Sequence, residues 1–572
     1  MSRHIVEFNR VRSLSMTVPN HCGFNRIQSL QQVFNFWNSN DHHQNNLCPL
    51  APRVESPQDG LLPPHRFIWD QSVRMREVDR LSKAVQIPTT VEEHMQDPYS
   101  EEFTPFLDFQ GLLQSLFPLT HSQARIDHIN RLGLVFTLNG TDHNLKPLLL
   151  AAHQDVVPTD NPSEWTYPPF SGHFDGEWLW GRGASDCKNL IIGLLSVIED
   201  LLAQEWHPIR TVILAFGFDE EIQGFLGARS ISSFLEQKYG RHSFEFIVDE
   251  GGMGIENLVN DEGVSEKGDI NIIFNLSVSG GHSSIPPPHT GIGIMSEVIY
   301  ALEREDLFIP LLDETHPSRR RLECQMRHSP NYVEPWLADI LQSTNYTFAA
   351  EKLALSRGPE FRFMVQTSQA ADIFNGGVKG NNLPKHISAL VNYRVAMHQT
   401  PDTVKSRAVH ITASIARKYN LTLFDFREGH TYEGNNYLHL STENSELRPS
   451  PISPMHLEKD AVWTRFAGVI RSVFESVPSL KGKTVVVIGD TMPGNTDTRF
   501  YWNLSKNIYR WEPVRTGKAL NIHATDERIA IDAHLETMTF YYELIRAFNV
   551  QDDSITQAQD KQPSMEDKTC TI

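Results

Sequence analysis

Four short runs of almost wholly apolar residues constrain the fold of this chain more than any other feature. They cover residues 148–152, 211–218, 246–248 and 484–488. A run that is apolar at every position has no solvent face, so it is typical of a strand buried on both sides within a parallel sheet. Residues 190–202 and 225–239 carry apolar side chains at the three- to four-residue spacing of amphipathic helices. This alternation of strands and helices predicts an α/β domain.

The middle of the chain has a different order of elements. A predicted strand from about residue 271 is followed by a helix near 294–303. After a long insertion the pattern continues with two strands, a helix and a further strand, at residues 362–367, 388–395, 401–419 and 421–426. Strand, helix, strand, strand, helix, strand is the order of a ferredoxin-like domain. We therefore predict a ferredoxin-like α+β domain inserted into the α/β domain.

Composition sets the expected domain boundaries. Residues 1–65 and 549–572 are polar and rich in turn-forming residues, which is typical of a mostly disordered leader and tail. Between them we expect the α/β domain in two parts, 66–270 and 431–548, on either side of an inserted domain at 271–430. Residues 306–360 extend the simple ferredoxin-like pattern, and we expect this insertion either to shape a pocket or to form a contact of the inserted domain.

Charge and composition exclude several classes of partner. Acidic residues outnumber basic ones, 70 against 51, and no long basic tract is present, so nucleic acid is not an expected partner. The five cysteines are scattered without a CxxC pair, which argues against a cysteine-based zinc site and a fold built on disulfides. No apolar run approaches the roughly 20 residues of a membrane-spanning helix, and the N-terminus lacks the apolar core of a signal peptide. No membrane span is therefore expected.

Histidine and acidic residues follow the apolar runs, at the point where each predicted strand ends. The candidates from three successive runs, a loop and a segment near the C-terminus are His153, Asp155, Asp186, Asp219, Glu220, Glu221, Asp249, Glu250 and His523. In open α/β sheets ligands bind at the carboxyl edge of the strands, so these side chains are expected to converge there.

Imidazole and carboxylate groups are suitable ligands for a divalent ion such as Zn²⁺. Two histidines and three carboxylates are too many for one catalytic ion, but they suit two ions if one carboxylate bridges them. A single histidine at a strand end is more often a structural residue, and an acidic DEE segment is usually a solvated turn. The repetition of such residues after three successive apolar runs favours a metal centre over these alternatives.

Several motifs occur in the order found in one family of enzymes. They are HQD, GRGASDCKN, FDEEIQGFLGA, VDEGG, SGGHSSIPP, NNLP and GNTDTRFYWNL. In these motifs the chain resembles the carboxypeptidase S or Gly-X carboxypeptidase branch of the co-catalytic di-zinc peptidases, which are aminoacylase-like, from about residue 82 to about residue 547. The resemblance implies a zinc-exopeptidase-like α/β catalytic domain with the inserted domain as a lid. It also implies hydrolysis of the C-terminal peptide bond of small peptides, with glycine next to last.

The resemblance implies two zinc ions per subunit with a shared ligand. One ion is held by His153, Asp186 and Asp249, and the other by Asp186, Glu221 and His523. Asp186 is then the bridging carboxylate. Asp155 orients His153, a role in which a carboxylate fixes a ligating imidazole. Glu220 is implied to be the general base that takes a proton from the attacking water.

Three residues of the inserted domain resemble substrate-binding groups of the family. His282 matches a histidine that stabilises the tetrahedral oxyanion, in some members from the partner subunit of a homodimer formed through the lid. Asn381 and Arg394 match groups that hold the substrate's backbone and its free carboxylate. Arginine suits the second task because its planar fork binds a carboxylate bidentately.

Two other functions remain open at this stage. An N-acyl-amino-acid amidohydrolase shares the same carboxylate clamp, so the expected substrates are small peptides or N-acyl amino acids with a free C-terminal carboxylate. An inactive metal-binding interaction protein requires the loss of a ligand or of the base, and none is lost. The resemblance implies a vacuolar or secretory-pathway location, whereas the lack of a recognisable signal peptide or anchor leaves the cytoplasm as the alternative.

Overall fold

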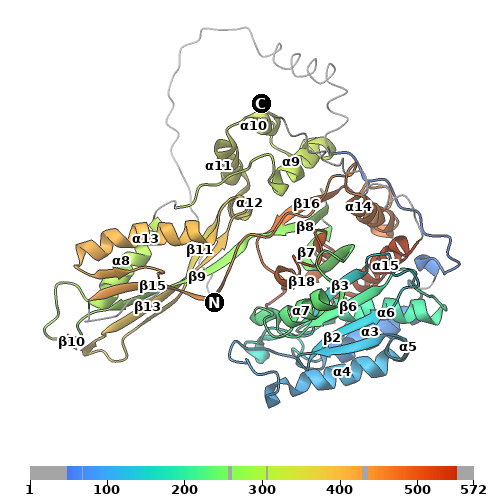
Figure 1. Cartoon of the computed structure of the whole chain (residues 1–572), viewed down its shortest axis with the longest axis horizontal. Coiled ribbons are helices and arrows are strands. Elements are labelled where there is room, and N and C mark those ends of the chain that lie inside the picture. Colours follow the sequence, from blue (N-terminus) through green and yellow to red (C-terminus); the bar gives the residue numbers. More distant parts are fainter. Residues whose placement is uncertain (1–47, 67, 256–259, 305–306, 428–435, 551–572) are drawn as a thin grey trace, which may run out of the picture. The chain divides into compact units, whose positions relative to one another are not determined.

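The computed structural model describes residues 48–66, 68–255, 260–304, 307–427 and 436–550 of the 572 residues. Residues 1–49 form a unit separate from residues 50–572. The predicted leader falls mainly on residues 1–47 and the predicted tail on residues 551–572, which lie outside the described residues. Within the second unit, an eight-stranded sheet and a five-stranded sheet define two domains (Figure 1). The predicted mixed α/β fold is confirmed.

The larger sheet has the strand order β1-β2-β6-β3-β7-β17-β8-β16. Its strands are β1 Arg125–Ile129, β2 Gly133–Leu138, β3 Leu148–His153, β6 Val212–Gly217, β7 Phe246–Ile255, β8 Asn260–Glu266, β16 Val487–Met492 and β17 Ile508–Arg515. Three of the apolar runs become β3, β6 and β7 at the centre, where β3 pairs in parallel with both neighbours. The sheet as a whole is mixed, because β2 pairs antiparallel with β6.

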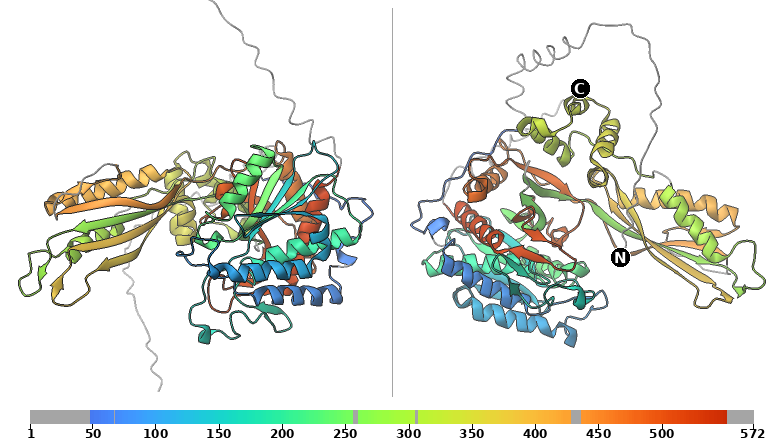
Figure 2. Two further views of the ribbon diagram at one scale, coloured as in Figure 1. Left: turned by 60° about the horizontal axis from the view of Figure 1, so that its bottom comes forward. Right: turned by 180° about the vertical axis from the view of Figure 1, so that it is seen from behind.

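Helices cover both faces of the larger sheet, which explains why its central strands are apolar throughout. Leu148 and Leu150 pack into a core that includes residues of α3 (Gln71–Val85), α6 (Lys188–Ala203), α14 (Ala461–Phe474) and α15 (Ile531–Phe548). Leu149 and Ala151 point to the opposite face and pack with α7 (Ala228–Tyr239). Figure 2 shows the first group of helices gathered on one side of the sheet. Further helices, α4 (Thr104–Leu116) and α5 (Pro118–Gln123), precede β1.

A small sheet joins two segments that are far apart in the sequence. It has the order β18-β19-β5-β4, formed by β4 His173–Phe174, β5 Trp178–Trp180, β18 Ala519–Leu520 and β19 Arg528–Ala530. β19 pairs antiparallel with β5, with Arg528 opposite Trp180. This pairing fixes the loop before α6 against the loop between β18 and β19.

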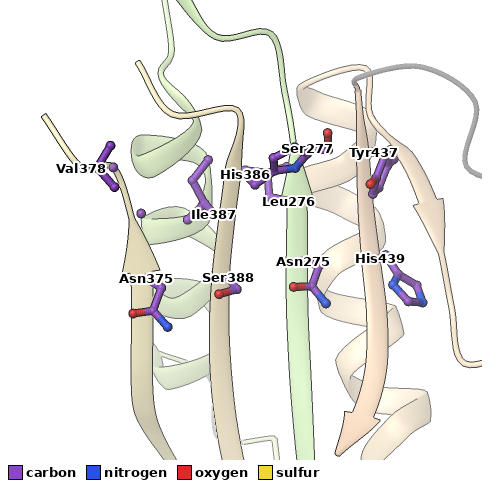
Figure 3. A pocket seen from close by; sticks show the side chains of 12 residues that line it. Asn275, Leu276, Ser277, Asn375, Val378, His386, Ile387, Ser388, Tyr437 and His439 are labelled. Carbon is purple, nitrogen blue, oxygen red and sulfur yellow. The ribbon is translucent and has the colours of Figure 1, made fainter. Parts of the chain in front are cut away.

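The inserted domain contains a five-stranded sheet in the order β11-β13-β9-β15-β14. Its strands are β9 Gly268–Ser277, β11 Ser368–Gly376, β13 His386–Val395, β14 Thr422–Phe424 and β15 Tyr437–Leu447. Alternate residues of β9 and β13, such as Phe274 and Val391, pack against α8 (Gly291–Arg304) and α13 (Pro401–Lys418). Helices therefore cover one face only, and Figure 3 shows both behind the sheet.

Two predicted boundaries in this region were wrong. The strand expected at 362–367 is helix α12 (Pro359–Val365), and β11 begins at Ser368. The α/β domain does not resume at residue 431, because β15 pairs with β9 and belongs to the lid sheet. Leu438 and Leu440 of β15 are buried in the lid core. The extra strand therefore shows the same alternation of buried and less buried side chains as its neighbours.

The insertion forms a small helical group with its own core. Its helices are α9 Pro317–His328, α10 Leu337–Gln342, α11 Tyr346–Arg357 and α12. Leu322 and Leu353 are buried in this core. The Ser318 hydroxyl of α9 donates to Asp490 Oδ1 of β16 at 2.5 Å. The insertion therefore packs beside an edge strand of the larger sheet, a common way of covering unpaired strand edges.

None of the helices among the described residues is long and apolar enough to cross a lipid bilayer. Residues 50–66 are expected as linker but are held against α14. The Val54 N–H donates to the Gly468 carbonyl at 3.3 Å. The chain before α3 is therefore part of the packed domain from Leu50 onwards.

Candidate metal centre

Four of the five expected metal ligands meet at the carboxyl edge of the larger sheet. His153 is the last residue of β3, and Asp186 lies in the turn before α6. Glu221 belongs to the short 3-10 helix η4 (Glu220–Ile222) that follows β6, and His523 lies in the loop between β18 and β19. The strand ends and the two loops joined by the small sheet thus bring these side chains together.

Asp186 lies between the two histidines. Its Oδ1 is 3.1 Å from Nε2 of His153, and its Oδ2 is 3.0 Å from Nε2 of His523. The same His523 nitrogen is 3.1 Å from Oε1 of Glu221. One carboxylate therefore presents a different oxygen to each imidazole, which is the arrangement required of a bridging ligand.

Three overlapping groups of side chains can each hold an ion at this centre. They are His153, Asp186, Cys187 and Glu250; His153, Glu220 and Glu221; and Asp186, Glu221 and His523; within each group the ligand atoms lie within 4.8 Å of one another. Asp186 is shared by the first and the last of these groups. Among the described residues, all side-chain groups of this kind lie at this edge of the sheet.

The middle of β7 supplies two adjacent carboxylates, Asp249 and Glu250, with different positions. Glu250 Oε2 is 3.3 Å from His153 Nε2, so Glu250 rather than Asp249 is the carboxylate in direct contact with the histidine. Asp249 Oδ1 accepts the Glu250 N–H at 2.9 Å, while its buried Oδ2 has no hydrogen-bond partner. The structure therefore places the Glu250 side chain at the centre and Asp249 next to it in the chain, and the role of Asp249 as a ligand stays a prediction.

Asp155 is buried and holds two members of the centre. Its Oδ1 is 3.3 Å from Nδ1 of His153, and its Oδ2 accepts the N–H of Glu221 at 2.9 Å. The same imidazole nitrogen is 3.0 Å from the Asp155 carbonyl oxygen. Asp155 can therefore orient His153 and also fix the backbone of Glu221.

Burial of several acids raises their pKa values. Burial, followed by the charge of Asp186, raises the pKa of Glu221 to about 7. Burial, followed by the charge of Glu250, also raises the pKa of Glu220 well above its ordinary value. Burial alone would raise the pKa of Asp186, but hydrogen bonds from both histidines hold it well below the usual range.

Carboxylates in such a site are costly to ionise unless a cation compensates them. The buried Oδ2 of Asp249, which has no hydrogen-bond partner, points to the same need. The imidazole and carboxylate donors of the centre suit a borderline divalent cation. The residues present therefore fit a metal ion.

Glu527 has a positioning role that the sequence did not reveal. Its fully buried carboxylate accepts backbone N–H groups from Gly183 at 3.1 Å, Ser185 at 3.0 Å and Asp186 at 3.1 Å. Arg182 donates to its second oxygen at 2.6 Å. Glu527 thus binds the turn that carries Asp186 to the segment that carries His523. An acid four residues after a candidate ligand was its only signal in the sequence.

Cys187 lies within the first group but already has a structural role. Its Sγ accepts the backbone N–H of His153 at 3.1 Å. Burial raises the pKa of the Cys187 thiol well above its ordinary value. A thiol that resists ionisation is a poor metal ligand, since the thiolate is the form that binds.

A cleft of about 640 Å³ lies beside the centre, and only one of the three predicted substrate-binding residues lines it. Arg394 of β13 lines it together with Glu220, Glu221 and His523. The Arg394 Nη1 donates to Asn495 Oδ1 at 2.7 Å. His282 and Asn381 are exposed at the far end of the lid, where β10 (Gly281–His282) pairs with β12 (Asn382–Leu383) (Figure 1). The described structure therefore brings Arg394, but not these two residues, to the metal centre.

A second hollow of about 750 Å³ lies on the uncovered face of the lid sheet (Figure 3). Asn375, Ser388, Asn275 and His439 form a row across β11, β13, β9 and β15. This row is polar, and no group of three metal-binding side chains occurs in it among the described residues. The chemistry therefore belongs to the cleft at the edge of the larger sheet.

Comparison with known proteins agrees with the fold and the donor set. Residues 149–547 match the model of Peptidase family M20/M25/M40. The chain belongs to this family of metal-dependent peptidases. Carboxypeptidase S of Saccharomyces cerevisiae is 36% identical over 520 residues, with 87% of each chain covered. The human N-fatty-acyl-amino acid synthase/hydrolase PM20D1 is 30% identical over 526 residues, covering 89% of this chain and 94% of the human protein.

Solved structures show the same fold. An M20 family metallo-carboxypeptidase from Sulfolobus solfataricus, Sso-CP2, has a TM-score of 0.57 at 17% identity and covers 83% of this chain and 99% of its own. Human carnosine dipeptidase 1 has a TM-score of 0.59 at 14% identity, covering 85% of this chain and 99% of its own. At these identities the likeness concerns the fold alone.

We predict that Glu527→Gln weakens metal binding without unfolding the protein. The amide presents N–H groups where backbone N–H groups now donate to a carboxylate, so the Asp186 turn loses its anchor. Loss of such a supporting partner typically lowers metal affinity by about 10–100-fold. Zinc affinity is measured by competition with a chelator, and circular dichroism checks the fold. Glu177→Gln, an exposed acid of the same region, serves as control. Unchanged zinc affinity in Glu527→Gln contradicts this role.

Proposed function

We propose that the protein is a zinc-dependent carboxypeptidase that hydrolyses the C-terminal peptide bond of small peptides, with glycine preferred next to last. The observation that carries this proposal is the position of Asp186, with one oxygen 3.1 Å from His153 and the other 3.0 Å from His523. A bridging carboxylate between two imidazoles is what a pair of catalytic ions requires. Identity to carboxypeptidase S over most of both chains supports the choice of reaction.

The residues of the chain divide the chemistry among them. His153, Asp186, Glu221, Asp249 and His523 would hold two zinc ions, which would supply Lewis-acid polarisation of the scissile carbonyl and a more acidic water. Glu220 takes the proton from the attacking water and delivers it to the leaving amine. Arg394 holds the terminal carboxylate of the substrate through its planar fork. Asp155 keeps His153 in the orientation needed for binding.

We propose Asp249 rather than Glu250 as the ligand that β7 supplies. Ile247 and Leu149 face the same core, and two-residue alternation puts Asp249 on that side of the sheet together with His153. Glu250 begins on the opposite side and reaches His153 with its longer side chain. The partnerless Oδ2 of Asp249 gives an ion a free oxygen.

Metal counting in two variants tests this choice. We expect Asp249→Asn to lose one zinc ion, because an amide oxygen is a weaker ligand than a carboxylate. Glu250→Gln should keep its zinc. Mass spectrometry of the native proteins or atomic absorption gives the counts. The reverse result, with zinc lost from Glu250→Gln alone, assigns the ligand role to Glu250.

A second candidate function is favoured by the identity to the human N-fatty-acyl-amino acid synthase/hydrolase. A peptidase and an acyl-amino-acid hydrolase both release an amino acid with a free carboxylate, and only the acyl half of the substrate differs. Hydrolysis of blocked Gly-Leu should be compared with that of a long-chain acyl-leucine. The proposal predicts the higher kcat/KM for the peptide. Hydrolysis of the acyl-leucine alone supports the second function, and zinc binding with no hydrolysis of either supports an inactive protein.

We also propose a homodimer formed through the lid. Strand β11 is at the edge of the lid sheet, and Ile373 and Phe374 on it are 48% and 44% exposed. Ile292 and Tyr300 of the neighbouring α8 are exposed as well. An exposed edge strand is a template for pairing with a second chain. His282 near the free end of the lid can then serve the partner's cleft.

We predict that Phe374→Glu yields a monomer. The charge placed on the exposed edge must lose its water when two copies meet, whereas the folded monomer leaves it hydrated. Analytical ultracentrifugation measures the change. Leu355→Glu, a change at a more exposed apolar residue of α11, should leave the dimer intact. A dimer that survives Phe374→Glu places the interface elsewhere.

For the compartment, we propose the lumen of the vacuole or of the secretory pathway. Cys48 takes part in a disulfide and so does Cys324, which favours an oxidising environment. Five N-glycosylation sequons are present, and the asparagines of four of them, Asn139, Asn345, Asn420 and Asn503, are exposed, whereas Asn275 is half-buried. Enzymatic removal of glycans from the native protein gives a direct check, since a cytosolic chain carries none.

Paired variants of the two adjacent glutamates test the division of roles. Glu220→Gln keeps the size of the side chain but removes the proton acceptor, so kcat should fall by about 10²–10⁴-fold with zinc still bound. Glu221→Gln should lose one zinc ion and recover partly in excess zinc. Turnover of blocked Gly-Leu and zinc content are measured for both. A zinc-poor, rescuable Glu220→Gln with a zinc-replete, inactive Glu221→Gln exchanges the two roles.

A further inference from the structure

Three side chains that carry or can carry positive charge line the cleft among the described residues: Arg394, Arg499 and His523. His523 is already paired with Asp186 and Glu221. The Arg394 Nε is 3.5 Å from Asp269, and its Nη1 is bonded to Asn495. Arg499 differs, because no salt bridge joins it to any described carboxylate and its Nη2 is buried without a hydrogen-bond partner.

Two aromatic rings fix the Arg499 guanidinium. It lies 5.2 Å from the ring centroid of Phe225 and 4.9 Å from that of Phe500. Phe225 follows the segment that carries Glu220 and Glu221, so the rings hold the guanidinium in the wall of the catalytic cleft. Cation–π contacts restrict the orientation of an arginine without using its N–H donors. The side chain is therefore preorganised, and its donors remain available to a ligand.

Asp219 interacts electrostatically with Arg499 but already has other hydrogen-bond partners. Asp219 is buried, and its two oxygens accept the N–H groups of Leu226 at 2.6 Å and Gly227 at 2.7 Å. Asp219 therefore closes a turn of the backbone and does not pair with the arginine. An unpaired buried donor costs free energy, and a ligand oxygen removes that cost.

Arg499 belongs to a segment of the cleft wall that Arg394 contacts. Asn495, which accepts from Arg394, precedes Arg499 by four residues, and both residues line the cleft. The proposed function assigns the terminal carboxylate of the substrate to Arg394. A guanidinium fork binds one carboxylate bidentately, so the second fork is left for a second anionic group.

We propose that Arg499 binds the side-chain carboxylate of an acidic C-terminal residue, which makes peptides ending in glutamate or aspartate a substrate class of this enzyme. This inference rests on the proposed carboxypeptidase function and deepens it. Two carboxylates on one residue engage two fixed forks on one wall of the cleft. A neutral residue of the same size engages only one fork.

Blocked Gly-Glu and blocked Gly-Gln test the proposal, because they differ in charge but hardly in shape. The ratio of kcat/KM for the two peptides should be about 10 or more in the parent enzyme and fall to about 1 in Arg499→Gln, the size expected from loss of a charge-assisted hydrogen bond. Arg241→Gln, which removes an exposed arginine outside the cleft lining, should keep the parent ratio. Arg394→Lys should lower both rates alike and keep the ratio as well.

Binding of the free amino acids supplies a readout without turnover. Calorimetry on the zinc-loaded protein should give tighter binding of glutamate than of glutamine, and Arg499→Gln should remove the difference. A ratio near 1 in the parent, or equal losses for both peptides in Arg499→Gln, overturns the inference while leaving a carboxypeptidase. Equal binding of both amino acids by a parent that cleaves no peptide overturns the proposed function and the inference together. Preference for glutamate without cleavage overturns the proposed function and the substrate class, and supports only the binding of a side-chain carboxylate by Arg499.

Discussion

The two contacts of Asp186 are the constraint on which the rest of the site depends. Its carboxylate is shared between His153 and His523, which come from opposite ends of the domain. Glu527 fixes the turn that carries Asp186. The pairing of β5 with β19 joins the same two segments of the chain. The small sheet and the Glu527 anchor therefore have a common effect. They hold two distant segments at the spacing that one bridging carboxylate can span.

The same geometry gathers several buried acids, and these acids are costly to ionise. Burial raises the pKa of Glu221 to about 7 and that of Asp249 to about 6, so each carboxylate is held at a cost near neutral pH. Helices on both faces of the sheet exclude water from the strand ends and create this cost. Divalent cations bound by the same carboxylates offset it. The fold thus has a physical reason to bind metal before any chemistry is considered.

The sequence was a good guide wherever a single periodicity decided the structure. The runs at 148–152 and 211–218 are apolar on both faces and became β3 and β6 at the centre of the sheet. It failed where an apolar segment fitted two structures, because residues 362–367 were expected as strand and α12 covers residues up to 365. It also missed β15, whose turn-rich surroundings hide a short alternation that only pairing with β9 makes stable.

Within the site, residue type predicted the ligands better than the supporting contacts. His153, Asp186, Glu221 and His523 follow strands or lie in motifs, and the structure brings them together. Glu527 contacts the Asp186 turn, which is far away in the sequence, so no local pattern could assign it. The contact of Arg499 with Phe225 also joins two distant segments. His282 and Asn381 are exposed where β10 pairs with β12, away from the cleft, so their predicted roles in substrate binding stay predictions.

The most direct measurement of the central claim is the zinc content of three variants. His153→Ala and His523→Ala each remove a ligand of one proposed ion, whereas Asp186→Ala removes a ligand of both. Each protein is loaded with zinc, freed of unbound metal and analysed by atomic absorption. The account predicts about two ions in the parent, about one in each histidine variant, and fewer in Asp186→Ala than in either. Equal zinc content in Asp186→Ala and His153→Ala would contradict a bridging role for Asp186.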